Sequence, residues 1–491
     1  MRQMFTLDEV RHAIGGDMVI KTGSPVFDTS VVISGVSSDT RTVEEGNIFF
    51  GIRGETFNGC EYAEQAMEKG ACCVVVDDAS YIPEGGIGIV VEDTVRALGQ
   101  LARHYRFKLG AKVIAVTGSV GKTSTRNMIA DVLRTGLNVH STKANNNNEI
   151  GMAKTILEAP EDTQVMVLEM GMRALGEISY LTGIARPDIA VITNVGYSHI
   201  GRLGSQENIM KAKMEIAEGL TDGGILAVNA DDGKLLNYAV NSLSINKLIA
   251  AVAVNDGTGE PVPSSCPVVM SAEDITEDDE GMQFAVRLKR MDTDYDSKER
   301  FSVPHHGAFA IRNALFALFC AYMCGLMNDQ GNLGPVREVI ANAGLGEGRG
   351  KIIETAKYLI VNDAYNAAPE SMENAFRSFG WTAKDKRKIA VLGGMLELGD
   401  YAPSLHEMTG KACAKYGFDI VFVTGDNADD FIRGALSVDS GLKIIKCADT
   451  EAVGKELEAY VRPGDAILFK ASHSFGFEGL AKTFTEKGNE T

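Results

Sequence analysis

A glycine-rich loop lies between an apolar segment and a helix-compatible segment, in an arrangement suited to binding phosphate. The apolar residues 113–116 precede the loop, and residues 127–133 have the composition of a helix. Glycines let backbone N–H groups surround phosphate oxygens, Lys122 brings charge to the outer phosphates, and the Thr123 hydroxyl can ligate magnesium. The sequence therefore predicts an ATP site whose phosphate loop consists of Gly118, Ser119, Val120, Gly121, Lys122, Thr123 and Ser124.

This loop is shorter than the common P-loop, G-x-x-x-x-G-K-[ST]. Val116 stands at the position of the first glycine, which leaves Gly118-x-x-Gly121-Lys122-Thr123. The alternative interpretation is a glycine turn that joins a strand to a helix and binds nothing. The order of strand, glycine loop, Lys-Thr pair and helix favours the nucleotide.

Two further side chains follow apolar segments that have the composition of buried strands. Glu169 comes directly after residues 165–168, where a carboxylate can hold a magnesium ion that also contacts nucleotide phosphates. Its alternative role is to cap a helix. His199 follows residues 189–192, and a neutral imidazole there can be a second metal ligand. A loop histidine taken alone is more often an ordinary polar residue.

The roles of three other polar features are less determined by spacing. Lys213 lies in the helical stretch 206–220, where its spacing alone favours a solvated lysine. Arg349 lies in a glycine-rich linker, where it is either a surface charge or a group that reaches a phosphate when domains close. Asn147 and Asn148 belong to a run of four asparagines that offers amides to a polar ligand or forms a turn.

Composition sets broad limits on what the chain does. A length of 491 residues suggests about three domains, and a formal net charge of −18 argues against a nucleic-acid partner. No apolar run is long enough to span a bilayer, and residues 1–27 lack a signal-peptide pattern. Eight cysteines without a C-x-x-C pair predict reduced, mostly buried thiols in a cytoplasmic protein.

Apolar segments that alternate with helical ones predict an α/β protein of three domains, bounded at 1–110, 111–345 and 346–491. We expect a small N-terminal α/β domain that ends in a helix over 94–107, a central P-loop domain with a parallel sheet, and a C-terminal Rossmann-like domain. Residues 249–303 predict an antiparallel excursion. Ligands bind at the carboxyl ends of parallel strands, so four side chains should converge there: Lys122, Glu169, Asn194 and Asn229.

Beyond the loop, the order of several motifs resembles that of the Mur ligase family over essentially the whole chain. The shortened loop fits that family, and the other matching segments are Asn145–Gly151, Glu169–Met172, Thr193–Gly196 with His199 and Lys213, Gly348–Gly350, Asp363–Met372, and Met395–Gly399 with His406. The stretches 365–369 and 395–399 resemble the branch of the family that adds D-alanyl-D-alanine. Asp39, Thr40 and Arg41, together with residues 57–59, resemble the segment that receives the UDP-sugar substrate.

The resemblance implies an ADP-forming ligase that joins D-alanyl-D-alanine to a UDP-N-acetylmuramoyl-tripeptide through an acyl phosphate, in peptidoglycan precursor synthesis. The three domains would bind, in order, the UDP-substrate, ATP and the incoming amine. The partners implied are these small molecules, with no nucleic acid and no membrane span, and we expect a monomer.

The resemblance also implies roles for single residues. Lys122, Lys213, His199 and Arg349 would be catalytic, and Asn313, Arg349 and Asp363 would bind ATP beside the phosphate loop. Two Mg²⁺ ions are implied, the first held by Thr123 and Glu169, the second by His199 and a carbamylated Lys213. The residues implied to contact substrate are Asp39, Thr40, Arg41, Asn147, Asn148, Tyr365 and Asn366.

Several positions depart from the family pattern. Gly-x-His-Asn-x-x-Asn is Gly307-Ala308-Phe309-Ala310-Ile311-Arg312-Asn313, Gly-Asp-Met is Gly393-Gly394-Met395, and Lys-Gly-Ser-Arg is Lys470-Ala471-Ser472-His473. Asn58 and Cys60 replace the commoner Asp and His. A sister ligase with another amine or carboxylate, and a paralogue that binds without ligating, therefore stay open as alternatives.

Overall fold

The computed structural model describes residues 3–23, 31–54, 56–242, 248–254, 266, 268–290, 294–327, 333–344 and 348–489. These residues form two compact units. The first comprises residues 1–113, 138–171 and 180–187, and the second comprises residues 114–137, 172–179 and 188–491. Each unit is described by itself.

The N-terminal part of the first unit is built on a sheet of strand order β2-β7-β6-β5-β4. Strands β4 to β7 pair in parallel and β2 pairs antiparallel with β7. The sheet strands are β2 (Asp17–Ile20), β4 (Gly35–Ser37), β5 (Asn47–Phe50), β6 (Cys73–Val76) and β7 (Ile87–Val90), and β1 (Phe5–Thr6) pairs separately with β3 (Val32–Ile33). Helices α1 (Leu7–Ile14) and α2 (Ala63–Glu68) complete this α/β domain.

The helix predicted over 94–107 is α3 (Thr94–Leu109). Asp93 starts it, because its Oδ1 accepts the N–H groups of Val95 and Arg96 at 2.9 and 3.0 Å. Gly110 ends it in the left-handed conformation with φ 65°. The first unit also contains α5 (Glu149–Glu158), which packs on α3, and the parallel pair β9 (Val139–Ser141) and β10 (Val165–Glu169).

The second unit begins with the parallel strands that follow one another as β13-β12-β11-β8. Their bounds are β8 (Lys112–Thr117), β11 (Ile189–Ile192), β12 (Ile225–Asn229) and β13 (Leu248–Val254). The helices here are α4 (Lys122–Leu133), α6 (Glu177–Ala185, which extends into the first unit), α7 (Ile200–Leu203), α8 (Gln206–Met214), α9 (Gly233–Ser242), α10 (Ala308–Met323) and α11 (Gly334–Ala341). Because the strands are parallel, their carboxyl ends share one edge.

The antiparallel excursion predicted over 249–303 is confirmed for the strands that follow β13. Strand β14 (Val268–Asp278) pairs in parallel with β13 and antiparallel with β15 (Gly281–Arg290), which in turn pairs antiparallel with β16 (Asp294–Val303). The tight turn between β14 and β15 places residues 278–281 at the tip of a hairpin.

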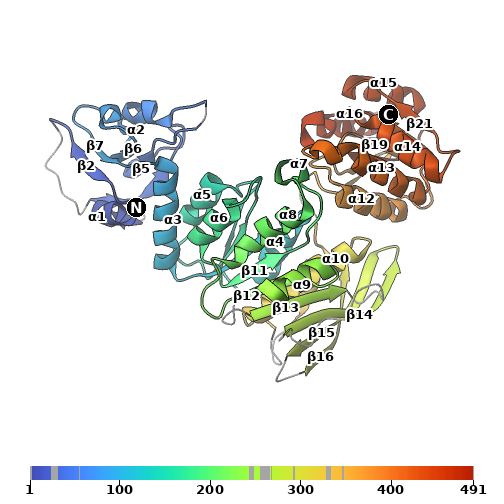
Figure 1. Cartoon of the computed structure of the whole chain (residues 1–491), viewed down its shortest axis with the longest axis horizontal. Coiled ribbons are helices and arrows are strands. Elements are labelled where there is room, and N and C mark those ends of the chain that lie inside the picture. The colour runs from blue at the N-terminus through green and yellow to red at the C-terminus, as the bar shows by residue number, and fades with distance from the viewer. Residues whose placement is uncertain are drawn as a thin grey trace. The chain divides into compact units, whose positions relative to one another are not determined.

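A third sheet lies at the C-terminal end of the second unit, with helices around its strands (Figure 1). Its strand order is β17-β18-β22-β19-β20-β21, all parallel except β17. Its strands are β17 (Lys351–Glu354), β18 (Leu359–Asn362), β19 (Lys388–Leu392), β20 (Ile420–Val423), β21 (Ile444–Lys446) and β22 (Ala466–Lys470). The helices are α12 (Pro369–Thr382), α13 (Ala402–Cys413), α14 (Ala428–Val438), α15 (Thr450–Tyr460) and α16 (Phe477–Asn489). This sheet agrees with the predicted Rossmann-like domain.

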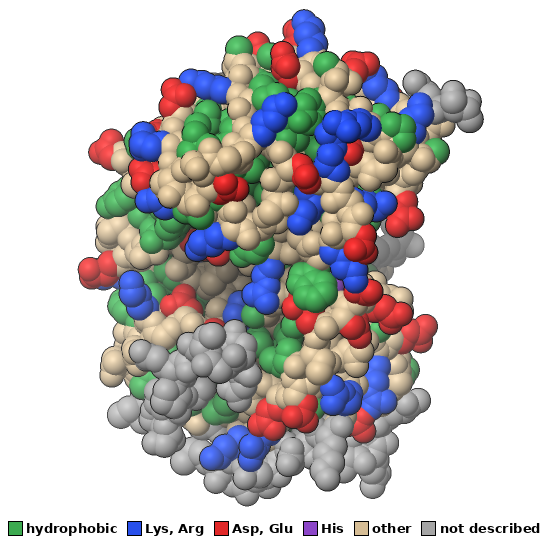
Figure 2. Space-filling view, turned by 90° about the vertical axis from the view of Figure 1, so that its right-hand side faces the viewer, with side chains coloured by type: hydrophobic (Ala, Val, Ile, Leu, Met, Phe, Trp, Pro, Cys, Tyr) green, Lys and Arg blue, Asp and Glu red, His purple; other side chains and the backbone are tan. Residues whose placement is uncertain are grey.

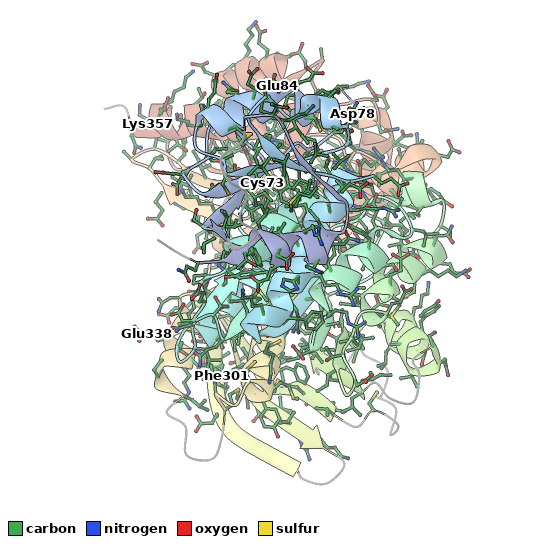
Figure 3. All side chains as sticks on the ribbon, turned by 90° about the vertical axis from the view of Figure 1, so that its left-hand side faces the viewer. Cys73, Asp78, Glu84, Phe301, Glu338 and Lys357 are labelled. Atoms are coloured by element: carbon green, nitrogen blue, oxygen red, sulfur yellow. The ribbon has the colours of Figure 1, made fainter. Side chains whose placement is uncertain are left out.

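All eight cysteines are within the described ranges, and each is a free thiol. Figure 3 labels Cys73, which lies in β6 of the N-terminal sheet and is fully buried. Burial raises the pKa of the Cys60 and Cys72 thiols to about 11, so both stay protonated at neutral pH. Among the described helices, we find none that is long and apolar enough to cross a bilayer.

Breaking a buried ion pair should destabilise the third domain. The Asp465 carboxylate is 4% exposed and accepts hydrogen bonds from Arg387 Nε and Nη2 at 2.8 and 2.7 Å, and from the Arg462 N–H at 2.7 Å. Asp465→Asn should lower the free energy of unfolding by roughly 2–3 kcal/mol, because it leaves a mostly buried guanidinium without its counter-charge. Urea unfolding followed by fluorescence of Trp381, the single tryptophan, measures this loss.

The matched control is Glu451→Gln, which removes an exposed carboxylate that pairs with Lys455 four residues away. It should change the free energy of unfolding by less than about 0.5 kcal/mol. Equal losses in both variants would contradict the importance of burial at Asp465.

Candidate active site

The phosphate loop joins β8 to α4, and its backbone depends on two glycines. Gly121 precedes the first residue of α4 and has φ 83°, in the left-handed region. A Cβ atom on Gly118 would overlap the Thr193 hydroxyl oxygen, so only glycine fits there. The loop therefore presents the start of α4, whose first N–H groups have no intrahelical partner and suit an anion.

Residues at the end of the neighbouring strand β11 hold the loop. Asn194 Oδ1 accepts the Ser119 and Val120 N–H groups at 3.0 and 2.9 Å. The Thr193 hydroxyl donates to the Val120 carbonyl at 2.6 Å. The predicted convergence of Asn194 with the loop is thus confirmed. Lys122 Nζ donates to the Gly118 carbonyl at 2.8 Å, so its charge lies beside the loop.

Asn313, predicted to contact adenine, is buried in α10, which packs on α4. Its Oδ1 accepts a hydrogen bond of 2.9 Å from the Thr125 hydroxyl. Asn313 also lines the cavity that the phosphate loop opens into. Phe309, where the family pattern has His, lines the same cavity.

This cavity has a volume of about 460 Å³ and is lined by both the central and the C-terminal domain. Its size suits a small-molecule ligand. From the central domain it receives Ser119 to Ser124, Asn194 and Asn313, and from the C-terminal domain it receives Arg349, Asp363, Asn366 and Lys470. The structure thus brings together most of the predicted ATP-binding residues.

Basic and acidic side chains are interspersed on the face shown in Figure 2.

Lys470 is a charged cavity residue to which the sequence analysis assigned no role. Its side chain is 2% exposed, and Nζ lies 2.8 Å from Asp363 Oδ2 and donates to the Asn366 carbonyl at 2.9 Å. Burial raises the pKa of Asp363, and the Lys470 charge opposes that shift. The Arg349 guanidinium lies 4.5 Å from the centre of the Tyr365 ring. Lys470 could have been predicted as a site residue from its position at the carboxyl end of β22, because ligands bind at that end of parallel strands.

Lys213 is 1% exposed, so its interpretation from spacing as a solvated lysine is wrong. Its helix α8 ends at Met214, short of the predicted residue 220, and the side chain points into the protein. Burial lowers the pKa of Lys213 well below its usual value, and the nearby Lys122 charge lowers it further. Burial and the neighbouring charge both favour the neutral form of this amine.

His199 lies in the segment after β11 and contacts Glu397 of the C-terminal domain. Its Nδ1 lies 2.5 Å from Glu397 Oε2. Burial is the main cause that lowers the pKa of His199, and the Glu397 charge opposes it. A neutral imidazole is the form that can ligate a metal.

Glu370, at the start of α12, lies within the matching segment Asp363–Met372, but the sequence analysis gave it no role of its own. Its Oε1 accepts the Tyr197 N–H at 2.9 Å, and a Cβ atom on Gly196 would overlap this carboxylate. Its buried Oε2 has no hydrogen-bond partner among the described residues. Burial raises the pKa of Glu370, and the Lys213 charge opposes the shift. Nothing in the sequence pattern distinguishes this acid from other first-turn acids of helices.

The other end of α12 also contacts the central domain. Trp381 stacks on His306, with ring centres 5.1 Å apart and an angle of 6° between the planes. Lys384, just beyond the helix, forms an ion pair with Asp279 at the tip of the β14–β15 hairpin. Both contacts border the same cavity.

Glu169 and the asparagines lie in the first unit. Asn147 Nδ2 donates to Glu169 Oε1 at 2.9 Å, and the Glu169 side chain is buried at the end of β10. Asn148 caps α5 through a 2.8 Å bond from the Gly151 N–H, which is the structural role left open for the asparagine run. The metal role of Glu169 beside Thr123 stays a prediction.

The predicted UDP-sugar segment forms a tight turn in the N-terminal domain. Asp39 accepts hydrogen bonds from the Arg41 guanidinium, which lowers the pKa of Asp39 to about 2. The Thr40 carbonyl accepts a bond from Lys69 Nζ at 2.8 Å. Asn58, in place of the commoner Asp, accepts the Cys60 N–H at 3.1 Å. The substrate roles of these residues stay predictions.

Comparisons with known proteins decide the family. Models of the Mur ligase family, catalytic domain, the Mur ligase middle domain and the Mur ligase, glutamate ligase domain match residues 32–106, 116–321 and 348–473. A UDP-N-acetylmuramoyl-tripeptide–D-alanyl-D-alanine ligase of Bacillus subtilis is 35% identical over 466 residues, which cover 94% of this chain and 95% of the relative. The chain belongs to the Mur ligase family.

Other relatives of this Mur ligase carry the same name. The enzyme of Synechocystis is 33% identical over 452 residues, which cover 90% of each chain. A crystal structure of MurF from Acinetobacter baumannii superposes with a TM-score of 0.81 at 25% identity, covering 98% of this chain and 99% of that one. MurF ligase from Thermotoga maritima in complex with ADP superposes with a TM-score of 0.74 at 26% identity, covering 92% and 97%. The three-domain α/β fold predicted from the sequence is confirmed, and the domain bounds stay predictions.

A side chain at Gly118 should strongly weaken nucleotide binding by this Mur ligase. Gly118→Ala forces the new methyl group against Thr193, and the loop must shift away from Asn194. We expect ADP affinity, measured by calorimetry, to fall at least about 100-fold, because the phosphate donors lose their arrangement.

The control is Gly183→Ala, since nothing lies within 4 Å of a Cβ atom at this helical position. It should bind ADP like the unaltered chain. Unchanged ADP binding in Gly118→Ala would exclude the loop as the phosphate site.

Proposed function

We propose that this chain is an ATP-dependent, ADP-forming ligase that joins D-alanyl-D-alanine to the terminal carboxylate of a UDP-N-acetylmuramoyl-tripeptide, in peptidoglycan precursor synthesis. The observation that carries the proposal is the shared cavity, in which the phosphate loop faces Arg349, Asp363 and Lys470 of the C-terminal domain. The names of the relatives supply the substrates, and the ADP complex of the Thermotoga structure supports the nucleotide.

The proposed reaction has two steps. A carboxylate oxygen of the tripeptide attacks the γ-phosphorus of ATP, the bond to ADP breaks, and an acyl phosphate forms. The free amine of D-alanyl-D-alanine then attacks the carbonyl carbon, phosphate leaves, and the nitrogen loses a proton. Lys122 at the loop and Arg349 across the cavity neutralise the phosphoryl charge that shifts in the first step. Walls from two domains line the cavity, and closing it further would protect the acyl phosphate from water.

The residues present fit magnesium. Among the described residues no cluster of three or more His, Cys, Asp or Glu side chains has metal-binding geometry. Mg²⁺ takes one or two protein oxygen ligands, such as the Thr123 hydroxyl and the Glu169 carboxylate, and completes its shell with phosphate and water. Thr123 and Glu169 would hold one ion, and His199 and Lys213 a second. Bound there, magnesium supplies positive charge to the phosphoryl oxygens.

We also propose that Lys213 carries a carbamate. The unprotonated amine of this buried side chain attacks the carbon of CO₂, an N–C bond forms, and the nitrogen releases a proton. The product is an anion in place of a cation. This charge reversal would relieve repulsion from Lys122 and give a metal an oxygen ligand.

Location and assembly complete the proposal. We propose a cytoplasmic monomer, and the absence of disulfides among its eight cysteines supports the location. A sister ligase that takes another amine is the second candidate, since Phe309, Gly394 and His473 depart from the family pattern near the third domain.

The function is tested first at Lys122. Lys122→Ala should lower ATP-dependent phosphate release by more than about 1,000-fold while the unfolding curve stays unchanged. The assay supplies UDP-N-acetylmuramoyl-tripeptides and a panel of amines, with products identified by mass spectrometry. Unchanged phosphate release in the variant would refute the ATP site.

The same panel separates the alternatives. Product with D-alanyl-D-alanine supports the proposal, and product only with another amine supports the sister ligase. Binding of both substrates without product supports a paralogue that does not ligate.

The Lys213 carbamate is tested with ¹³C-bicarbonate at pH 8 and carbon NMR. An ordinary lysine is mostly protonated there, but the lowered pKa of Lys213 favours its neutral, reactive amine, so a carbamate signal should appear. It should vanish in Lys213→Ala.

The matched control is Lys211→Ala on the same helix. Lys211 is about half exposed, and its pKa is raised by Glu207, so the signal should persist in this variant. A spectrum without the signal in the unaltered protein would refute the modification.

A further inference from the structure

The segment Glu397–Tyr401 of the C-terminal domain packs directly on the segment Ser198–Gly204 of the central domain, which contains α7. The Gly201 N–H donates to the Glu397 carbonyl at 3.0 Å, and the Tyr401 hydroxyl donates to the Gly204 carbonyl at 2.8 Å. A Cβ atom on Gly201 would lie 2.5 Å from the Gly399 nitrogen. The two backbones therefore meet without room for a side chain between them.

His199 and Glu397 face each other in this contact. Nδ1 of the imidazole lies 2.5 Å from Glu397 Oε2, and Arg202 Nη2 lies 3.6 Å from Glu397 Oε1. Both residues have left-handed backbones, with φ 66° at His199 and φ 60° at Glu397. Such conformations are costly for residues other than glycine and persist where surrounding contacts enforce them.

The C-terminal domain supports Glu397 from behind. His406 Nε2 accepts the Met395 N–H at 3.0 Å, and its Nδ1 donates to the Ala402 carbonyl at 2.7 Å. The Ser472 hydroxyl oxygen accepts the Leu396 N–H at 3.2 Å. The segment that carries Glu397 is therefore fixed on both sides before it reaches the central domain.

A carboxylate at Nδ1 decides which ring nitrogen is available. An ionised carboxylate can only accept a hydrogen bond, so this contact favours a proton on Nδ1 and leaves the Nε2 lone pair for a ligand. Histidines that ligate metals usually donate their other N–H to a carboxylate or carbonyl, which fixes the ring and its tautomer.

We propose that Glu397 is a positioning residue that holds His199 as the Nδ1–H tautomer with Nε2 directed to the magnesium site. This inference rests on the proposed function, in which His199 is a metal ligand. Because Glu397 belongs to the C-terminal domain, the metal site is complete only when that domain contacts the segment 198–204. Metal affinity and domain contact are thereby coupled.

The test uses the full chain with ADP, and Mn²⁺ as the metal probe. Electron paramagnetic resonance of free Mn²⁺ gives the dissociation constant. Glu397→Ala should weaken Mn²⁺ binding about 10- to 100-fold. Glu397→Gln should lose less, since its amide oxygen still accepts the Nδ1–H.

Tyr401→Phe is the matched control, because it removes an interdomain hydrogen bond and leaves Glu397 in place. It should bind Mn²⁺ within about twofold of the unaltered chain. Equal weakening in Tyr401→Phe and Glu397→Ala would overturn the proposal, since domain contact alone would then explain the loss.

Nitrogen NMR of the ¹⁵N-histidine protein without metal provides a second readout. The signal that disappears in His199→Asn should show a protonated Nδ1 in the unaltered chain and lose that preference in Glu397→Ala. An Nε2–H tautomer, unchanged Mn²⁺ affinity in Glu397→Ala, or no Mn²⁺ binding by the unaltered chain would each overturn the assignment. The tautomer measurement with Glu397→Gln still decides if the alanine variant does not fold.

These outcomes are separate from those of the ligase assay. If the unaltered chain forms no amide product, the proposed function fails, whereas the tautomer and Mn²⁺ measurements still report on Glu397.

Discussion

Thr193 and Asn194, at the end of β11, hold the phosphate loop against the sheet through hydrogen bonds to Ser119 and Val120. The approach is so close that Gly118 has no space for a side chain. The position of Lys122, the start of α4 and the cavity that receives the C-terminal residues all follow from this contact. A shortened loop is sufficient here because the neighbouring strand supplies the support.

Charge balance in a desolvated space is the second constraint on the site. Lys122 and Lys213 repel each other, and the carboxylates of Glu370 and Glu397 reach the same region from the C-terminal domain. Taking such groups out of water is unfavourable unless opposite charges or ligands accompany them. The proposed Lys213 carbamate would replace a positive charge in this region with a negative one, and the proposed magnesium ions would pair with the negative groups. Nucleotide, metal and domain contact are therefore expected to favour one another.

Local patterns predicted the elements of the fold and the residues that lie within them. Apolar strands, the helix over 94–107 and the glycine loop each carry their signal within a few residues. The burial of Lys213 could not be predicted in this way, since helical spacing does not show which neighbours cover a side chain. Glu370, Glu397 and Lys470 were missed as site residues because tertiary contacts between separate segments give them their roles.

Helix α12 contacts the central domain at both ends, through Glu370 at Tyr197 and through Trp381 at His306. Eleven residues of helix separate these points by about 16 Å, and a helix of this length behaves as a rigid rod. A rotation of the C-terminal domain about the Glu370 contact would therefore displace Trp381 in proportion to this length, and it would also have to break the hydrogen bond between Tyr401 and Gly204.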